Sequence, residues 1–322
     1  MALDFWKSSH AQQWIFDKTE IWKQRAEDMK TYCEEEYSRL NIFWANFITA
    51  VATECAHSQA NVGCKLRQQV IATAIVYFKR FYLRQSFRDM CPFLVASTAL
   101  FLACKVEEHT TLSVSSFLKN TALVSRITMP HSNHTPDRIN NLNYIKEFLP
   151  KRWGVAFETN SAKNGVLYDS EFILVEILDC CLVVHHAMRP MFELLEDWKQ
   201  HTLTSTNTPV KDFDQIEIQC QKVVNDTLRC DVGLMFAPHC IGLASISVGM
   251  ELMGRGEELE DWLVEVDTDM DKLADCINQI YTMYQLWRSF DEKEEVKKLM
   301  AKLPKPNTPI PPPQQQQSSY HM

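Results

Sequence analysis

The sequence predicts an all-α protein, and three observations lead to that prediction. Only 8 of the 322 residues are Gly, and six of the 13 Pro lie after Leu303, so the body of the chain has little turn punctuation. Apolar residues recur at helical spacing, as in the broad stripe over residues 34–55. The chain is also long enough to bury a sizeable core. We therefore expect long helices packed around one another.

Residues 68–108 are predicted to form a central pair of helices joined at a proline. The second helix, over residues 92–103, is apolar on nearly every side, so other helices must surround it. Small residues spaced along it allow neighbouring helices to approach closely. The stretch ends in charged residues, among them Lys105 and Glu107. The buried helix thus delivers a charged cluster to the surface.

An additional peripheral helix is predicted at the N-terminus, over residues 11–29. Ser9 followed three residues later by Gln12 fits a capping box, and the apolar residues that follow are intermittent. Phe5 and Trp6 precede this cap, and two interpretations stay open for them. They form either a hydrophobic staple, which is the commoner use, or an exposed anchor for a partner.

The central pair is followed by a less regular region. Residues 113–127 predict a modest helix, and residues 128–165 are polar and rich in turn signals, which favours a surface insertion. A strongly apolar helix is predicted over residues 169–184, with Glu171 at its start. The first half of the chain therefore supplies five helices after the peripheral one.

The second half repeats the plan of the first. Residues 219–254 again show an amphipathic helix, a short linker and a helix rich in small residues, and a long helix follows at residues 270–290. In both copies an arginine ends the first helix and a proline begins the second, at similar spacing: Arg84 and Pro92, then Arg229 and Pro238. This pattern indicates duplication of one five-helix unit.

Composition excludes several classes of function. The net charge of −8 has both signs interspersed, so direct binding of nucleic acid is not expected. No run of apolar residues is long enough for a membrane span, and no secretory signal is present. The 11 cysteines are scattered through apolar patterns, as reduced core cysteines are. Residues 304–322 are rich in Pro and Gln and predict a disordered tail.

Catalytic and metal-binding motifs are absent from the sequence. There is no phosphate-binding glycine loop and no G-x-S-x-G nucleophile motif. Glu54 and His57 have the spacing of half a di-iron site, but the second pair that such a site requires is missing. We therefore expect no nucleotide-using activity, no cofactor and no metal site.

Several polar residues occupy positions that packing alone does not explain. Asn225 and Asp226 are predicted to lie in the middle of an apolar helix, where a satisfied buried hydrogen bond and a polar recognition site are both consistent. Lys105 and Glu171 lie at helix ends that suit their charges, so interaction with the helix dipoles is sufficient to explain them. Tyr284, one turn before a tryptophan, is more typical of a core residue.

A family resemblance gives these residues a common purpose. The chain resembles the cyclins, and within them the regulatory subunit of the Mediator kinase module, over most of residues 1–306. The segments that carry the resemblance are FWKSSH, RQQVIAT, VYFKRFY, FLACKVEE, EILDCCLVVHHAMRP, VVNDT, YQLWRSFDEK and KLPKP. The resemblance implies a fold of two tandem five-helix cyclin boxes with an extra N-terminal helix. The boundaries are then 1–33 for the N-terminal segment, 34–187 and 188–303 for the two boxes, and 304–322 for the tail.

The resemblance also implies a non-catalytic activator of a cyclin-dependent kinase. In cyclins, a lysine that ends the third helix and a glutamate that starts the fifth reach the kinase beside its αC helix. These positions correspond to Lys105 and Glu171, which we expect to be exposed. The alternatives are another transcriptional cyclin or, with less support, a helical transcription factor of the TFIIB type. The latter predicts a basic face and a zinc ribbon, and the sequence shows neither.

Further partners follow from the same resemblance. The partners expected are the cyclin-dependent kinase of the Mediator kinase module and the other subunits of that module, with a nuclear role in RNA polymerase II transcription. The subunit that activates the module is expected to occupy a groove between the two boxes. The implied groove residues are Trp6, Glu107, Asn225, Asp226 and Tyr284.

Overall fold

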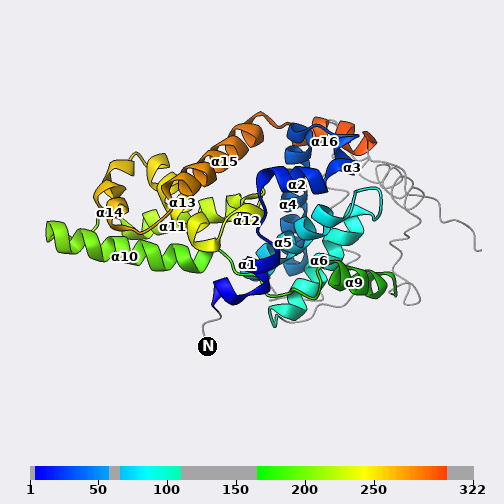
Figure 1. Cartoon of the computed structure of the whole chain (residues 1–322), viewed down its shortest axis with the longest axis horizontal. Helices are drawn as coiled ribbons and strands as arrows, with labels where there is room; N and C mark the ends of the chain where they lie inside the picture. The colour runs from blue at the N-terminus through cyan, green and yellow to red at the C-terminus, as the bar shows by residue number, and fades with distance from the viewer. Residues whose placement is uncertain (1–3, 58–65, 110–164, 303–322) are drawn as a thin grey trace, which may run out of the picture.

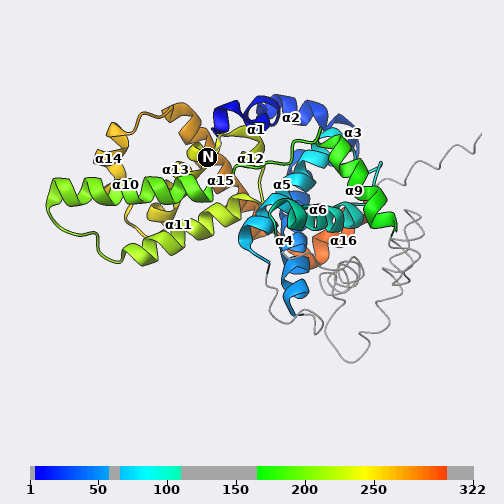
Figure 2. The same ribbon diagram turned by 90° about the horizontal axis from the view of Figure 1, so that it is seen from below.

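The computed structural model describes residues 4–57, 66–109 and 165–302, and within these ranges it contains helices and no strand. The all-α prediction is confirmed. The helices form two lobes side by side, with the N-terminal helices lying across the junction (Figure 1). Turning the molecule by 90° shows the same two lobes and the N-terminal helices along one edge (Figure 2).

The first lobe surrounds α6 (Pro92–Val106), with Pro92 in its first turn, where a missing amide hydrogen does no harm. The helices that pack with it are α4 (Glu34–His57), α5 (Gln68–Arg84) and α9 (Gly165–Ile177). A cluster of aromatic rings fills this core, including Trp44, Phe47 and Phe93. Burial of nearly every residue of α6 confirms its central position.

The second lobe has its own hydrophobic core around α13 (Pro238–Leu252), which also begins with a proline. Its other elements are α10 (Met188–Thr206), α11 (Phe213–Thr227), α12 (Val232–Met235), η5 (Gly256–Leu259), α14 (Glu260–Glu265) and α15 (Met270–Ser289). Helix α13 packs against α10, α11 and α15, just as α6 packs against α4, α5 and α9. The repeat that the sequence shows is therefore also a repeat of packing.

The N-terminal segment differs from the single helix predicted over residues 11–29. It forms η1 (Phe5–Lys7), α1 (Ser9–Gln13), α2 (Lys18–Gln24) and α3 (Ala26–Met29). The cap is Ser8, one residue before the predicted Ser9, and its Oγ accepts a hydrogen bond from the amide of Ala11 at 3.3 Å. The helix is interrupted because the amide of Phe16 donates to the carbonyl oxygen of Leu234 in the second lobe, at 2.8 Å.

Two other predicted helices require correction. Helix α9 ends at Ile177 rather than continuing to residue 184, because Asp179 and Cys180 adopt left-handed backbone angles with φ of 50° and 56°. Asn225 and Asp226 lie in the last turn of α11 rather than at its middle. Cys180 is consequently exposed, not a core cysteine.

The last described helix, α16 (Glu292–Lys302), was not predicted. It packs on α4 and contributes Val296 and Leu299 to the core of the first lobe. The helix predicted over 113–127, residues 128–164 of the predicted insertion and the tail over 304–322 lie outside the described residues. The proposed domain boundaries, including the one at 187, stay predictions.

Among the helices that the structure describes, none has the length and apolar character that crossing a membrane requires.

Candidate functional site

Lys105 and Glu171, predicted separately from the sequence, meet at the surface of the first lobe. Lys105 lies in the last turn of α6, but Glu171 lies at the middle of α9 and not at its start as predicted, so the helix dipole does not explain it. The Lys105 Nζ is 2.7 Å from each carboxylate oxygen of Glu171. The Lys105 side chain is 38% exposed, but the Glu171 side chain is only 14% exposed. The prediction that both would be exposed is therefore wrong for Glu171, which is partly covered by its own ion pair.

Exposed apolar side chains surround this ion pair. The Lys105 Nζ lies 4.3 Å from the centroid of the Phe101 ring and 5.8 Å from that of Tyr168, within the range of cation–π attraction. On α9, Tyr168, Phe172 and Ile173 are 45%, 78% and 44% exposed. We define the α6/α9 face as Tyr168 and Phe172, which lie one helical turn apart, together with Lys105 and Glu171. A charged pair inside an exposed apolar patch is typical of a protein-binding surface.

A groove of about 870 Å³ lies between the two lobes. Its walls are the outer side of α5, the connector at 183–190, the end of α11 and the start of α13, and the N-terminal segment closes one side. Trp6 and Asn225, two of the residues predicted for a groove, line it. We call this feature the interlobe groove.

Trp6 stands at the rim of the interlobe groove and is 65% exposed. Its ring centroid lies 5.7 Å from that of His239 and 5.1 Å from that of Phe5. Phe5 in turn packs edge-on against His10 and His185. Phe5 packs inward, as the staple interpretation expects, and Trp6 faces solvent, as the anchor interpretation expects.

Glu107 is bound to α5 by two hydrogen bonds. Its carboxylate accepts from the Nε2 of Gln69 and from the Oγ1 of Thr73, each at 2.6 Å. Because the Thr73 hydroxyl has one proton and gives it to Glu107, the His186 Nε2 at 2.7 Å must be the donor to Thr73. Burial, with a contribution from Arg80, lowers the pKa of His186 to about 4 and keeps the ring neutral. Glu107 is therefore linked to the groove indirectly. It binds Gln69, which lines the groove, and Thr73, which binds the groove residue His186.

Asp226 and Tyr284 contact each other instead of lining the groove. The hydroxyl of Tyr284 donates to the Oδ2 of Asp226 at 2.9 Å, and Arg229 donates to its Oδ1 at 2.8 Å. Arg229 also stacks on Trp287 at 4.1 Å and donates to Asn46 on α4 at 2.9 Å. Burial raises the pKa of Asp226, although Arg229 opposes that shift. Of the five predicted groove residues, Trp6 and Asn225 therefore line the groove and Glu107 lies beside it. Asp226 and Tyr284 instead bind each other near the contact that Arg229 makes with α4.

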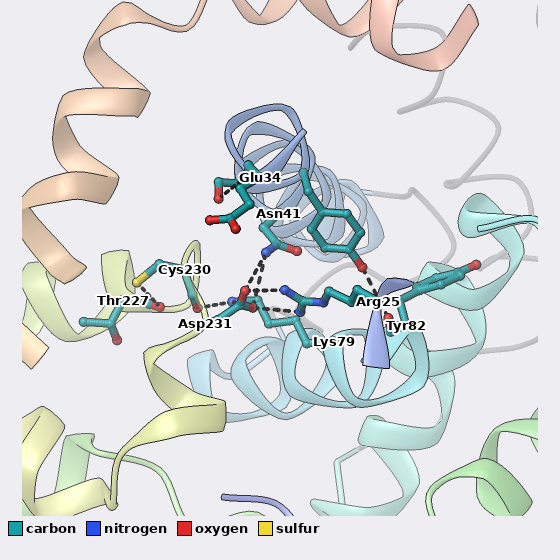
Figure 3. Close-up of polar contacts among 10 residues, drawn as sticks. Arg25, Glu34, Asn41, Lys79, Tyr82, Thr227, Cys230 and Asp231 are labelled. Atoms are coloured by element: carbon teal, nitrogen blue, oxygen red, sulfur yellow. Dashed lines mark hydrogen bonds and ion pairs between the residues drawn. The ribbon is translucent and has the colours of Figure 1, made fainter. Parts of the chain in front are cut away.

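A cluster of charged residues that sequence reasoning missed lies between the lobes. Asp231, just before α12, accepts hydrogen bonds from Arg25 and from Asn41 on α4 (Figure 3). The Nζ of Lys79 on α5 lies 3.9 Å from the Oδ1 of Asp231. We call these four residues the Asp231 cluster. Arg25 and Asp231 are 206 positions apart, so no spacing rule could have paired them.

The described residues offer no set of ligands for a metal ion, since no group of three or more His, Cys, Asp or Glu side chains converges there.

Comparison with known proteins identifies the family. Cyclin-C of Caenorhabditis briggsae is 92% identical over 322 residues, and Cyclin-C of Caenorhabditis elegans is 76% identical over 326 residues, each alignment covering all of both chains. The chain belongs to the cyclin C family. Cyclin-C of Drosophila melanogaster is 34% identical over 98% of this chain and all of its own length. Residues 59–141 also match the family profile described as the cyclin N-terminal domain.

Solved structures with the same fold include chains of kinase complexes. A chain of the CAK complex from Chaetomium thermophilum aligns with a TM-score of 0.62 at 18% identity, covering 94% of this chain and 89% of its own. A chain of the yeast TFIIK complex gives 0.58 at 23% identity, with coverage of 85% and 99%. A chain of the yeast RNA polymerase II CTD kinase complex gives 0.52 at 14% identity, with coverage of 93% and 86%. At these identities the likeness establishes the cyclin C chain's fold alone.

Proposed function

We propose that this member of the cyclin C family binds and activates the cyclin-dependent kinase of the Mediator kinase module, and thereby regulates RNA polymerase II transcription in the nucleus. The full-length identity with cyclin C chains supports the family part of this proposal. The likeness to a chain of an RNA polymerase II CTD kinase complex supports a transcriptional kinase as partner. The chain itself acts as a regulatory subunit without catalysis.

The observation that carries the proposal is the α6/α9 face. A basic and an acidic residue from two different helices meet beside exposed aromatic side chains on the first lobe. The resemblance to cyclins implies that these two residues contact the kinase αC helix. Phe172 is the most exposed of the aromatic residues there and would provide the apolar anchor. Lys105 and Glu171 would exchange part of their mutual ion pair for partners on the kinase.

The physical mechanism is selection of one kinase conformation. A protein kinase requires its β3 lysine paired with the αC glutamate and its DFG aspartate on Mg²⁺, and the pairing depends on where αC lies. Helix α6 is buried from Pro92 to Cys104, so Lys105 extends from a rigid support. A rigid surface that binds only the inward position of αC shifts the kinase toward its active state by its differential affinity.

The interlobe groove is proposed as the site of the module's activating subunit. Trp6 and Asn225 would contact that subunit directly because both line the groove. Glu107, Asp226 and Tyr284 belong to the same proposal as residues that shape the surroundings of the groove, since their polar atoms bind neighbouring side chains.

Charge reversal on the α6/α9 face tests the kinase part of the proposal. We expect Lys105→Glu and Glu171→Lys each to weaken binding of the purified Mediator-module kinase by about tenfold or more, because each variant places like charges together and presents the wrong charge to the partner. The thermal midpoint should fall by only a few degrees, because the pair is partly exposed and its loss, together with the repulsion that replaces it, costs about 1–2 kcal/mol. Binding is measured by calorimetry and activation by phosphorylation of a peptide.

A matched control uses another surface ion pair. Lys199 and Glu196 on α10 are joined at 2.8 Å, are 38% and 51% exposed and lie outside the interlobe groove, so Lys199→Glu makes the same kind of change in the second lobe. It should leave kinase binding unchanged. If the α6/α9 variants bind and stimulate the kinase normally, the proposal is wrong, and if they lower the melting midpoint strongly, the Lys105–Glu171 pair serves the fold.

A further inference from the structure

One helical turn of the N-terminal segment contacts both lobes. Arg25, the residue before α3, makes its ion pair with Asp231 of the second lobe. Asp28, within α3, makes its hydrogen bonds with the loop that connects α5 and α6 in the first lobe. Three positions along one short helix therefore separate a contact to one lobe from a contact to the other.

The contact to the second lobe is a two-pronged ion pair. The Arg25 Nη1 lies 2.6 Å from Asp231 Oδ2, and Nη2 lies 3.1 Å from Oδ1. Asn41 Nδ2 also donates to the two oxygens, at 3.2 and 3.1 Å. Lys79 donates to the carbonyl oxygen of Cys230, the residue before Asp231. Figure 3 shows these donors converging on the same turn from three separate elements.

The charges in this cluster are held in place by one another. The side chains of Arg25, Lys79 and Asp231 are only 1%, 7% and 14% exposed. Burial alone would raise the pKa of Asp231, but Arg25 and Lys79 bring it below its usual value. Removal of one partner leaves a buried charge without compensation, which is more costly than loss of an exposed pair.

The contact to the first lobe is equally local. Asp28 Oδ1 accepts from the Oγ of Ser86 at 2.6 Å and from the amide of Phe87 at 3.1 Å. Asp28 is 2% exposed, and the ring of Phe87 packs against Tyr37 of α4. Helix α3 is therefore held to the α5–α6 loop by the hydrogen bonds of the buried Asp28 carboxylate.

The Asp231 cluster also borders the interlobe groove. Lys79 and Cys230 both line the groove. Lys79 belongs to the α5 wall, and Cys230 lies in the turn that follows α11. Asn225, at the end of α11, lies only a few residues before Cys230. A change in how Asp231 is held would therefore move the α11 wall relative to α5.

We infer that Arg25 and Asp28 are positioning residues, which hold the second lobe against the first through α3 and thereby set the shape of the interlobe groove. This arrangement concerns how the lobes are placed, so it does not depend on kinase binding. The α6/α9 face lies wholly in the first lobe, and the same substitutions should leave it intact.

Hydrogen–deuterium exchange of the full chain tests this inference. In Arg25→Gln we expect faster exchange at the Phe16 amide, which bonds to Leu234, and over residues 230–236. The central parts of α6 and α13 should stay protected, because the two cores remain intact. Arg25→Lys keeps the charge near Asp231 and should restore part of the protection, which a purely steric role for Arg25 would not explain.

Two further variants make the experiment decisive. Arg39→Gln removes an arginine that joins α4 to Glu295 on α16, within the first core, and should not change exchange over 230–236. Asn41→Ala removes one neutral donor from the cluster and gives a milder form of the same local effect. Unchanged exchange at Phe16 and over 230–236 in both Arg25→Gln and Asn41→Ala would overturn the inference, as would a uniform rise that includes α6 and α13.

The result can be separated from the proposed function. Exchange is measured on the chain alone, so it does not require the kinase to be the right partner. Normal kinase binding by Asn41→Ala with a loosened junction supports both accounts, whereas loss of kinase binding in that variant contradicts the independence of the α6/α9 face.

Discussion

Helices α5 and α11 occupy equivalent places in the two repeats, but they are buried to different extents. Every residue of α5 from Val70 to Leu83 is buried, including Lys79 and Arg80. In α11 the buried residues form one stripe, namely Ile216, Cys220, Val223, Val224 and Thr227. The same unit is therefore fully enclosed in one copy and covered on one side in the other.

The difference arises from what covers the outer side of each helix. The N-terminal segment lies against α5, where Trp14 stacks on Arg80 at 4.8 Å and on Arg84 at 4.3 Å. The second lobe reaches α5 as well, through Cys230 and Lys79. Most of the outer side of α11 faces solvent, and Ile218 is 50% exposed. Duplication thus supplied two scaffolds, of which only the first became the centre of the molecule.

The largest predicted effect compares two aligned positions. When Arg84 is aligned with Arg229, Tyr77 of α5 corresponds to Lys222 of α11. Tyr77 is fully buried, so Tyr77→Ala should lower the free energy of unfolding by about 3–5 kcal/mol. Lys222 is exposed, and Lys222→Ala should change it by less than about 0.5 kcal/mol. Urea denaturation measures both, and equal losses would contradict the comparison.

A smaller effect is expected from pH, because ionisable groups are buried around the outer side of α5. Burial lowers the pKa of His10 to about 3 and that of His186 to about 4, so both stay neutral in the folded chain but take up protons on unfolding below pH 6.5. Burial raises the pKa of Asp28 to about 6, so the folded chain takes up a proton there as the pH falls, which opposes the loss. From pH 7 to 5 the net loss of stability should be about 2–3 kcal/mol.

The pH effect has its own control. In His186→Gln the side-chain amide still donates to Thr73 but does not titrate, so the loss between pH 7 and 5 should fall below about 1 kcal/mol. Thermal unfolding at several pH values measures it. A variant that keeps the full pH dependence would show that His186 is not responsible.

The smallest predicted effect concerns close packing in the second repeat. A Cβ atom added at Gly242 of α13 would lie 3.0 Å from the backbone nitrogen of Met191 and 3.3 Å from the carbonyl oxygen of Ala187. Because backbone atoms cannot move aside, Gly242→Ala should cost about 1–3 kcal/mol. Gly233 in α12 has open space around its Cα, so Gly233→Ala should be neutral or stabilising by up to about 1 kcal/mol. Denaturation midpoints distinguish the two.

Local patterns in the sequence predicted the central helices well. Prolines at 92 and 238 mark the starts of α6 and α13, and apolar periodicity gave α4 from Glu34 to near its end. The ends of other elements depend on distant contacts that no local pattern shows. Arg84 donates to the carbonyl oxygen of Ile177 at 2.9 Å, at the point where α9 stops.

The candidate site was predictable residue by residue but not as an arrangement. The resemblance to cyclins selected Lys105 and Glu171, yet their ion pair joins residues 66 positions apart and became visible only in three dimensions. Asp226 was expected to face a partner, but its carboxylate binds Tyr284 and Arg229 because all three meet where the lobes touch. Arg25 and Asp231 gave no signal at all, since each is an ordinary charged residue until the chain folds.

The most direct test of the central claim is kinase activation by the doubly reversed variant, Lys105→Glu with Glu171→Lys. This variant restores an ion pair between α6 and α9, so its melting midpoint should match that of the unmodified chain, while both charges presented to the kinase are inverted. We predict that stimulation of the Mediator-module kinase is lost despite normal folding. Full stimulation by the doubly reversed variant would contradict the account, because the pair would then serve the fold alone.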